Sequence, residues 1–293
     1  MVNRELRAIH VAIACSLTGV FAKSIVGTMT HSMSMLSSAI DSLGDLFVSV
    51  VNLFVVRLAA KGPDDDHNYG HAKIEGLGAM FEGGFIFAAA SFIVYEAVHK
   101  IVVGEKSHDS VMGIVVMVPI LLVTIATVTY LRKVAKETGS IVIRADATHY
   151  MMDVYVNLGV LFALVLVKLT GEPIIDSIVS VAIALYMFRA AAGIVKDGFD
   201  IVMDKSLAPD VVERLQATLA ACTAIDSWHD FKTRLGRVPF VDFHIVVRPE
   251  LTAREVHEIF LAFQRDMRAI AGPTTKVLMH TDIAAPAPST ASL

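Results

Sequence analysis

The sequence predicts a membrane all-α bundle of six transmembrane helices, followed by a small cytosolic α+β domain. Apolar residues make up 55% of the 293 residues, and the mean hydropathy is +0.61. These residues lie in blocks long enough to cross a bilayer core of about 30 Å. From about residue 205 the chain is mixed in polarity and ends in a stretch rich in proline, alanine and serine. A membrane domain over 1–204 and a soluble domain over 205–283 are therefore expected.

Six apolar segments are the candidate transmembrane helices, and they cover residues 8–30, 33–58, 77–100, 111–131, 147–169 and 174–196. Basic residues gather before the first segment and in the second and fourth connections: Arg4, Arg7, Arg57, Lys61, Lys73, Arg132, Lys133, Lys136 and Arg144. By the positive-inside rule, both termini are expected to be cytoplasmic, so the soluble domain faces the cytosol.

Charge and cysteine content exclude several classes of protein. The net charge of −4 argues against nucleic acid as a partner. Cys15 lies in a predicted span and Cys222 in the soluble part, so no disulfide is expected. The apolar run around Cys15 continues well past it, which argues against a cleaved signal.

Polar residues follow one face of two predicted spans. In the second span they recur at the helical period, which directs them toward protein rather than lipid: Ser34, Ser38, Asp41, Asp45, Ser49 and Asn52. The fifth span does the same with Asp146, His149, Asp153 and Asn157. At 1.5 Å per residue, Asp41 and Asp45 lie roughly 12–18 Å from the outer end of their helix. His149 and Asp153 are expected at a similar depth from the inner end of theirs. Both pairs are therefore expected near mid-depth.

These two pairs offer three carboxylates and one imidazole, a four-coordinate shell that suits a divalent transition metal. Ionisable groups at membrane depth mark ion pathways by default. A single acid could serve helix packing alone, but two pairs at matching depth favour a site. Metal ligands must be deprotonated, so metal binding expels protons. The pattern thus predicts exchange of metal for protons. Glu82 and Lys23 are expected to face neighbouring helices rather than lipid.

A second cluster lies in the connection after the second span. Asp64, His67 and His71 fall within eight residues and could close on one metal ion. The alternative is a solvated charged loop without metal. We expect a metal site that binds more weakly than the membrane site.

The soluble part has the order αββαβ, which suits a small domain with its helices on one face of a sheet. The expected elements are a helix at 208–222, strands at 227–234 and 239–248, a helix at 252–270 and a strand at 275–282. Thr252 and Glu255 form a predicted capping box. Residues 284–293 are expected to be a disordered tail.

Five residues of this domain are candidate metal ligands: His229, His244, His257, His280 and Asp282. Surface histidines are common without metal, so their spacing alone is weak support. His280 and Asp282 lie on one face of a predicted strand, because side chains alternate with a period of two.

Several motifs together resemble those of the cation diffusion facilitator family, most closely its bacterial proton-coupled zinc and iron exporters. The resemblance covers residues from about 10 to 283. It rests on Gly19-x3-Lys23, Ala39-Ile-Asp41-Ser-Leu-Gly-Asp45, Asn52-Leu-Phe-Val-Val-Arg57, Asp64-Asp-Asp-His67-Asn-Tyr-Gly-His71-Ala-Lys73-Ile-Glu75, Arg144-Ala-Asp146-Ala-Thr-His149-Tyr-Met-Met-Asp153 and His280-Thr-Asp282.

The resemblance implies a multi-pass homodimer of the bacterial inner membrane, with a metallochaperone-like (ferredoxin-like) cytosolic domain. It implies a transport site made of Asp41, Asp45, His149 and Asp153, and a loop site made of Asp64, His67 and His71. It also implies a binuclear cytosolic Zn²⁺ site that stabilises the dimer and uses His229, His244, His257, His280 and Asp282. Lys73 and Asp204 match a charge interlock near the dimer interface.

Three residues depart from the family pattern. Met151 and Met152 stand between transport ligands where the bacterial exporters carry polar residues, and Glu82 replaces an amide. Each substitution could shift metal preference or proton stoichiometry.

The leading expectation is a secondary active transporter, not an enzyme, that exports Zn²⁺ from the cytoplasm in exchange for protons. Fe²⁺ and Cd²⁺ are further candidates. One alternative is a metal-sensing or assembly protein that does not transport, but such a protein has no need of proton-exchangeable ligands in lipid. Another is a passive channel, but conduction requires weak or multiple sites rather than a closed shell.

Overall fold

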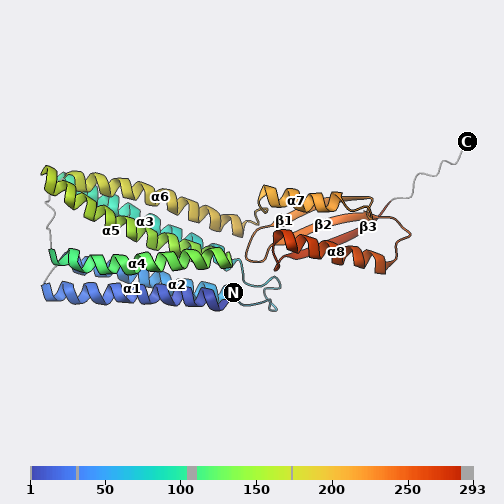
Figure 1. Ribbon diagram of the computed structural model, residues 1–293, viewed down its shortest axis with the longest axis horizontal. Helices are drawn as coiled ribbons and strands as arrows, with labels where there is room; N and C mark the ends of the chain where they lie inside the picture. Colours follow the sequence, from blue (N-terminus) through green and yellow to red (C-terminus); the bar gives the residue numbers. More distant parts are fainter. Residues whose placement is uncertain (1, 31–32, 104–110, 173, 285–293) are drawn as a thin grey trace, which may run out of the picture. The chain divides into compact units, whose positions relative to one another are not determined.

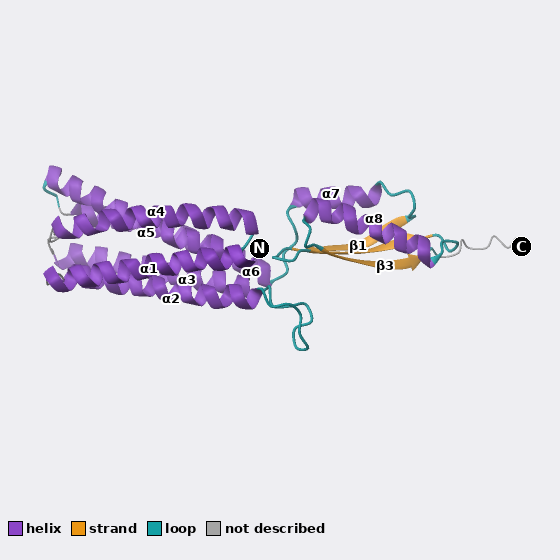
Figure 2. Cartoon of the chain, turned by 60° about the horizontal axis from the view of Figure 1, so that its bottom comes forward, coloured by secondary structure: helices purple, strands orange, loops and turns teal. Residues whose placement is uncertain are grey.

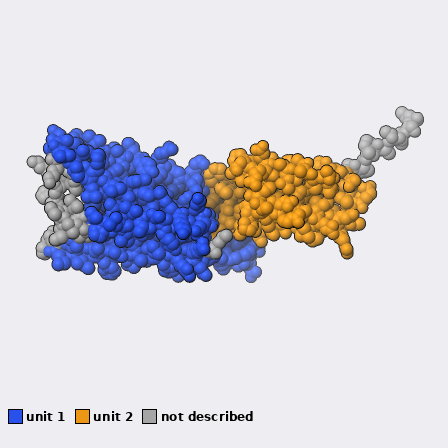
Figure 3. All heavy atoms as spheres, viewed as in Figure 1, with its two compact units in different colours: residues 1–199 blue, residues 200–293 orange. Residues whose placement is uncertain are grey.

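The structure is a computed structural model that describes residues 2–30, 33–103, 111–172 and 174–284. The chain divides into two compact units, residues 1–199 and 200–293 (Figure 3). The predicted domain boundary at 204/205 stays a prediction. Apart from Ala284, the predicted tail at 284–293 lies outside the described residues.

The first unit is built from long helices (Figure 1). Their bounds are α1 Val2–Thr30, α2 Met33–Ala59, α3 Ile74–Val103, α4 Val111–Thr138, α5 Ile141–Thr170 and α6 Ile174–Val202. All six are long and apolar enough to cross a membrane, so the predicted bundle is confirmed.

Most of these helices extend a few residues past the predicted spans, because hydropathy marks the apolar part and not the ends of a helix. Helix α5 shows how the true ends are set. Its N-cap Ser140 accepts a hydrogen bond from the backbone N–H of Ile143. Gly171 ends the helix at φ +75°, a backbone conformation that glycine adopts readily.

The helices pack most extensively as α1 with α2 and α4 with α5, while α3 packs against α2 and α5. Small residues allow close approach of helices in a membrane. At Gly198 of α6, a Cβ atom would lie 2.5 Å from the carbonyl oxygen of Gly76 in α3. Any larger side chain at this position would push the two helices apart.

The second unit is an α+β domain with the predicted order αββαβ. Its elements are α7 Pro209–Ala220, β1 Ser227–Arg234, β2 Phe240–Val247, α8 Ala253–Ala271 and β3 Lys276–Ile283. The strand order is β1-β2-β3, with β1 antiparallel and β3 parallel to β2. The capping box is present, with Thr252 and Glu255 each accepting the other's backbone N–H.

Helices α7 and α8 cover one face of the sheet (Figure 2). Alternate residues of β2 pack against them in the core, including Phe243 and Ile245, which meet Leu215, Phe263 and Met267. Because side chains alternate across a strand, the residues between them face the other side. That uncovered face of the sheet carries His244.

Candidate metal centres

Asp45, His149 and Asp153, called the membrane trio below, lie close together in the helix bundle. Each offers a ligand atom within 4.8 Å of the others. The Nε2 atom of His149 lies 3.1 Å from Oδ1 of Asp45, which joins α5 to α2. His149 is buried, and the ring of Phe85 packs 5.8 Å from its own. Two carboxylates and one imidazole in this arrangement can bind one divalent transition metal.

The structure does not bring Asp41 into this trio. Asp41 is exposed on α2, one turn from Asp45. It lines the same cavity, of about 550 Å³, as the membrane trio. All six long helices contribute to the lining of this cavity. A change in the position or side-chain rotamer of α2 would be needed for Asp41 to join the other three.

Other polar groups line the cavity. Lys23 of α1 donates from Nζ to the Ser42 hydroxyl at 2.8 Å and to the carbonyl of Ser38 at 3.3 Å. A cation therefore already stands in the same cavity as the acids. Met152 also lines the cavity, whereas Met151 does not. Met152 thus places a soft thioether side chain, rather than a polar one, at the cavity wall.

The side chain of Tyr150 ties three helices together beside the membrane trio. Its hydroxyl donates to the carbonyl of Ala12 at 2.9 Å. It also lies 2.6 Å from the Ser16 hydroxyl and 2.9 Å from the Ser49 hydroxyl. This network fixes α5 against α1 and α2 at the residue next to His149.

Glu82 does not line the cavity. It lies in a fully buried polar cluster with Asn52 of α2 and Asp146 of α5. The expectation that it faces a neighbouring helix is therefore met.

The loop between α2 and α3 brings together its three predicted ligands. The carboxylate of Asp64 lies 3.4 Å from Nδ1 of His67 and 3.5 Å from Nε2 of His71. The two imidazole rings are 4.5 Å apart. A tight turn produces this geometry, since the backbone N–H of His67 donates to Asp64 at 2.8 Å.

Lys61 also binds this loop carboxylate. Its ammonium donates to Asp64, and together with the backbone N–H of His67 it holds the pKa of that carboxyl well below its usual range. Asp64 is therefore a ready anionic ligand. Lys61 would compete with a metal for one of its oxygens, which fits a weaker site.

His229, His244 and His280, called the histidine row below, stand side by side across the sheet. His229 of β1 pairs with His244 of β2, which pairs in turn with His280 of β3. The carboxylate of Asp282 lies beside this row: its Oδ2 is 3.4 Å from Nε2 of His229 and 3.2 Å from Nδ1 of His244. Nε2 of His280 lies 3.5 Å from its other oxygen. Imidazole and carboxylate groups packed this closely suit Zn²⁺.

His257 does not join the histidine row in a single chain. It is exposed on α8, the helix whose core side chains pack on the covered face of the sheet. Its nearest recorded ring is that of Phe260, at 6.5 Å. The histidine row is on the uncovered face, so another element or a second chain is needed to bring His257 to it.

Sequence reasoning missed Asp230. The pairing of β1 with β2 shifts between His229 and Lys232, which is a β-bulge. Asp230 sits in it at φ +51° and points its carboxylate to within 3.8 Å of Nε2 of His244. A hydrogen bond from Lys232 lowers the pKa of Asp230. The three-residue spacing of Trp228 and Phe231, which pack together, is the signal of a bulge in the sequence.

Asp204 forms an ion pair with Arg234 in the second unit, with Nε of Arg234 3.4 Å from its carboxylate. The predicted pairing of Asp204 with Lys73 would span the two units, so it stays a prediction.

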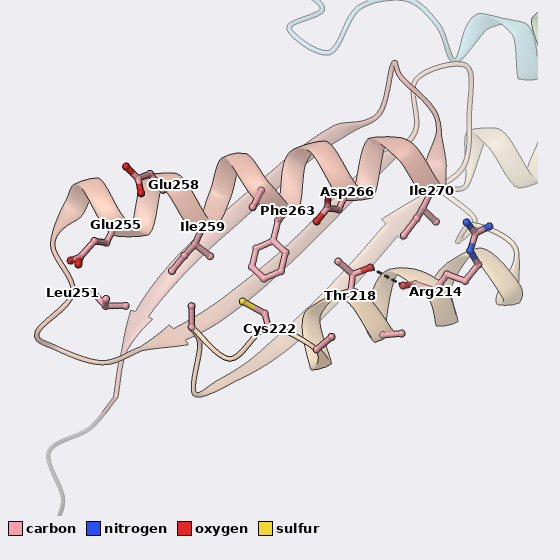
Figure 4. A pocket seen from close by; sticks show the side chains of 14 residues that line it. Arg214, Thr218, Cys222, Leu251, Glu255, Glu258, Ile259, Phe263, Asp266 and Ile270 are labelled. Carbon is pink, nitrogen blue, oxygen red and sulfur yellow. Dashed lines mark hydrogen bonds between the residues drawn. The ribbon is translucent and has the colours of Figure 1, made fainter.

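A further cavity, of about 990 Å³, lies between α7 and α8. Ile259, Phe263 and Ile270 point from α8 toward α7 there (Figure 4). None of the metal-ligand clusters found among the described residues contributes a side chain to its lining.

Comparison with known proteins agrees with this arrangement. Residues 9–203 match the cation efflux transmembrane domain, and residues 207–284 match the cytoplasmic domain of cation efflux proteins. The cation-efflux pump FieF of Shewanella oneidensis is 29% identical, over 94% of this chain and 93% of its own. That of Serratia proteamaculans is 31% identical, over 86% and 84%.

The family models together span nearly the whole chain, and these relatives align over most of their own length. The chain therefore belongs to the cation efflux family, as a multi-pass membrane transporter and not an enzyme.

Proposed function

We propose that the chain is a secondary active transporter that exports Zn²⁺ from the cytoplasm in exchange for protons. Fe²⁺ and Cd²⁺ are the alternative cargoes that the same ligands accept. The observation that carries this proposal is the membrane trio, whose ligand atoms lie within 4.8 Å of one another inside the bundle. The imidazole of His149 argues for Zn²⁺ over Mn²⁺, which prefers oxygen ligands.

Proton exchange follows from the chemistry of these ligands. Carboxylate and imidazole groups bind a metal only after they lose their protons. The site therefore holds either a metal ion or protons, and each displaces the other. A proton gradient directed into the cell would then drive metal outward.

We assign the transport site to Asp41, Asp45, His149 and Asp153. Asp41 lies in the same cavity but outside the membrane trio, so it would be the ligand that joins or leaves during the cycle. Asp64, His67 and His71 would bind the metal weakly in the loop before it reaches this site, since their ligand atoms also lie within 4.8 Å.

We further propose that the protein is a homodimer in the bacterial inner membrane, with both termini in the cytoplasm. The histidine row and Asp282 would hold structural Zn²⁺. His257 lies on the helix layer of one chain, so a second chain is the simplest way for it to complete a binuclear site. Metal shared in this way would stabilise the dimer.

The test is metal uptake into inside-out membrane vesicles with an acidic interior. The Asp45→Ala variant should take up Zn²⁺ at least about 100-fold more slowly, because a direct ligand is lost. Glu137→Ala is the matched control, since Glu137 is an acid on α4 that forms an ion pair with Arg4. It should transport like the wild type.

Collapse of the pH gradient with a protonophore should remove the driving force in wild-type vesicles. Wild-type rates in Asp45→Ala would refute the ligand assignment. Uptake that ignores the pH gradient would refute proton exchange.

A further inference from the structure

A second group of metal-ligating side chains lies deep in the bundle, outside the membrane trio. Asn52 of α2, Glu82 of α3 and Asp146 of α5 are each 0% exposed. The Nδ2 atom of Asn52 lies 3.2 Å from Oε2 of Glu82 and 3.3 Å from Oδ1 of Asp146. One amide thus bridges two carboxyl groups from different helices. We call these three residues the amide–acid cluster.

Each member of the amide–acid cluster keeps one oxygen without a partner. Oδ1 of Asn52, Oε1 of Glu82 and Oδ2 of Asp146 are buried and accept no hydrogen bond from any residue that the structure describes. Buried polar atoms are nearly always satisfied, and an exception calls for an explanation such as a bound ion. Burial of carboxylates is especially costly unless a positive charge compensates them.

The amide–acid cluster lies on the cytoplasmic side of the membrane trio. Helix α2 ends and α5 begins at the cytoplasmic face, since α6 leads from that face into the cytoplasmic domain. Asn52 is therefore about 10 Å nearer that face than Asp45. Asp146 precedes His149 by about one helical turn. A cation that moves from the cytosol to the membrane trio would pass this level of the bundle.

We propose that Asn52, Glu82 and Asp146 form a second cation station, which binds a divalent metal ion through oxygen atoms before it reaches the transport site. This inference rests on the proposed function. Two carboxylates match the charge of a divalent ion, and the amide oxygen adds a neutral ligand. An all-oxygen set suits Mn²⁺ and binds Zn²⁺ or Fe²⁺ less firmly than a set with imidazole.

The difference in ligands between the amide–acid cluster and the transport site would favour movement of the ion from the first to the second. Zn²⁺ or Fe²⁺ held by oxygen atoms alone gains affinity when it moves to a site that contains the imidazole of His149. The amide–acid cluster would thus accept the ion from the cytosolic side and pass it outward to the membrane trio. The lack of an imidazole also predicts that this station discriminates less strongly against Mn²⁺ than the transport site does.

The test is a titration of the purified full-length protein with Mn²⁺, in which free Mn²⁺ is counted by electron paramagnetic resonance. Wild type should bind one more Mn²⁺ per protomer than Glu82→Gln or Asp146→Asn, or bind that ion about tenfold more tightly. Both changes conserve side-chain volume. Glu137→Gln is the control for the loss of an acid elsewhere on a membrane helix, and it should bind like the wild type.

A third variant distinguishes the loss of a metal ligand from a folding defect. Asn52→Asp adds a carboxylate to the station and should tighten the binding of Mn²⁺, a gain that a damaged protein cannot produce. The same titration in the Asp45→Ala background should still show the extra ion, because the station does not use Asp45. This measurement tests the second cation station independently of the assignment of the transport site.

Equal Mn²⁺ binding by wild type, Glu82→Gln and Asp146→Asn would overturn the proposal. Unchanged binding with a shifted pH profile of transport would also overturn it, because the amide–acid cluster would then hold protons only. Failure of Asp45→Ala to slow transport would refute the proposed function. The number of bound Mn²⁺ ions would still show whether the amide–acid cluster binds a cation.

Discussion

The membrane trio and the histidine row use similar ligands, but different forces place them. In the sheet, hydrogen-bonded register sets His229, His244 and His280 next to one another, at the spacing of neighbouring strands. In the bundle, the contact between Asp45 and His149 depends on how the side chains of α2 and α5 meet, and Asp41 remains outside it. We therefore expect the histidine row to retain its metal ion and the proposed transport site to release it.

The sharpest test of this comparison contrasts two acids of the proposed transport site. Asp153→Ala removes a member of the membrane trio and should weaken Zn²⁺ binding at least about 100-fold. Asp41→Ala removes the ligand that lies outside and should weaken binding only about tenfold while slowing transport more. Both are measured as Zn²⁺ affinity of purified protein and as uptake by vesicles. Equal losses of affinity would mean that the four ligands are equivalent.

A smaller effect is expected in the sheet, where His244 is compared with His257. His244 is central to the histidine row, so His244→Ala should weaken Zn²⁺ binding by the cytoplasmic domain of the full-length protein about 10- to 100-fold. His257→Ala should change the affinity of the row within about twofold, since His257 is on the other layer. Calorimetric titration checks both. A larger loss in His257→Ala would mean that His257 is itself a ligand at the histidine row.

The sequence predicted the elements well because their signals are local. Hydropathy identifies six spans, and the period-two pattern of β2 identifies the face of the sheet that forms the core. The predicted loop ligands Asp64, His67 and His71 lie within eight residues, so one turn suffices to bring them together. Thr252 and Glu255 mark the start of α8 for the same reason.

The features that the sequence could not predict depend on how separate helices and strands pack against one another. The i,i+4 spacing shows that Asp41 and Asp45 share a face, but the rotation and tilt of α2 decide which of them reaches His149. The alignment of the histidine row depends on strand register, and Asp230 reaches it only through a bulge. The amide–acid cluster needs three helices to pack at one level, which no single segment encodes.

The central claim is that a divalent cation binds in the bundle through one imidazole and carboxylates. X-ray absorption spectroscopy of bound Zn²⁺ tests it most directly, in a variant whose other sites are removed by His67→Ala, His71→Ala, His229→Ala, His244→Ala and Glu82→Gln. We expect a four-coordinate ion with one imidazole and oxygen ligands at about 2.0 Å, which is lost on Asp45→Ala. Two or more imidazoles, or no bound Zn²⁺, would contradict it.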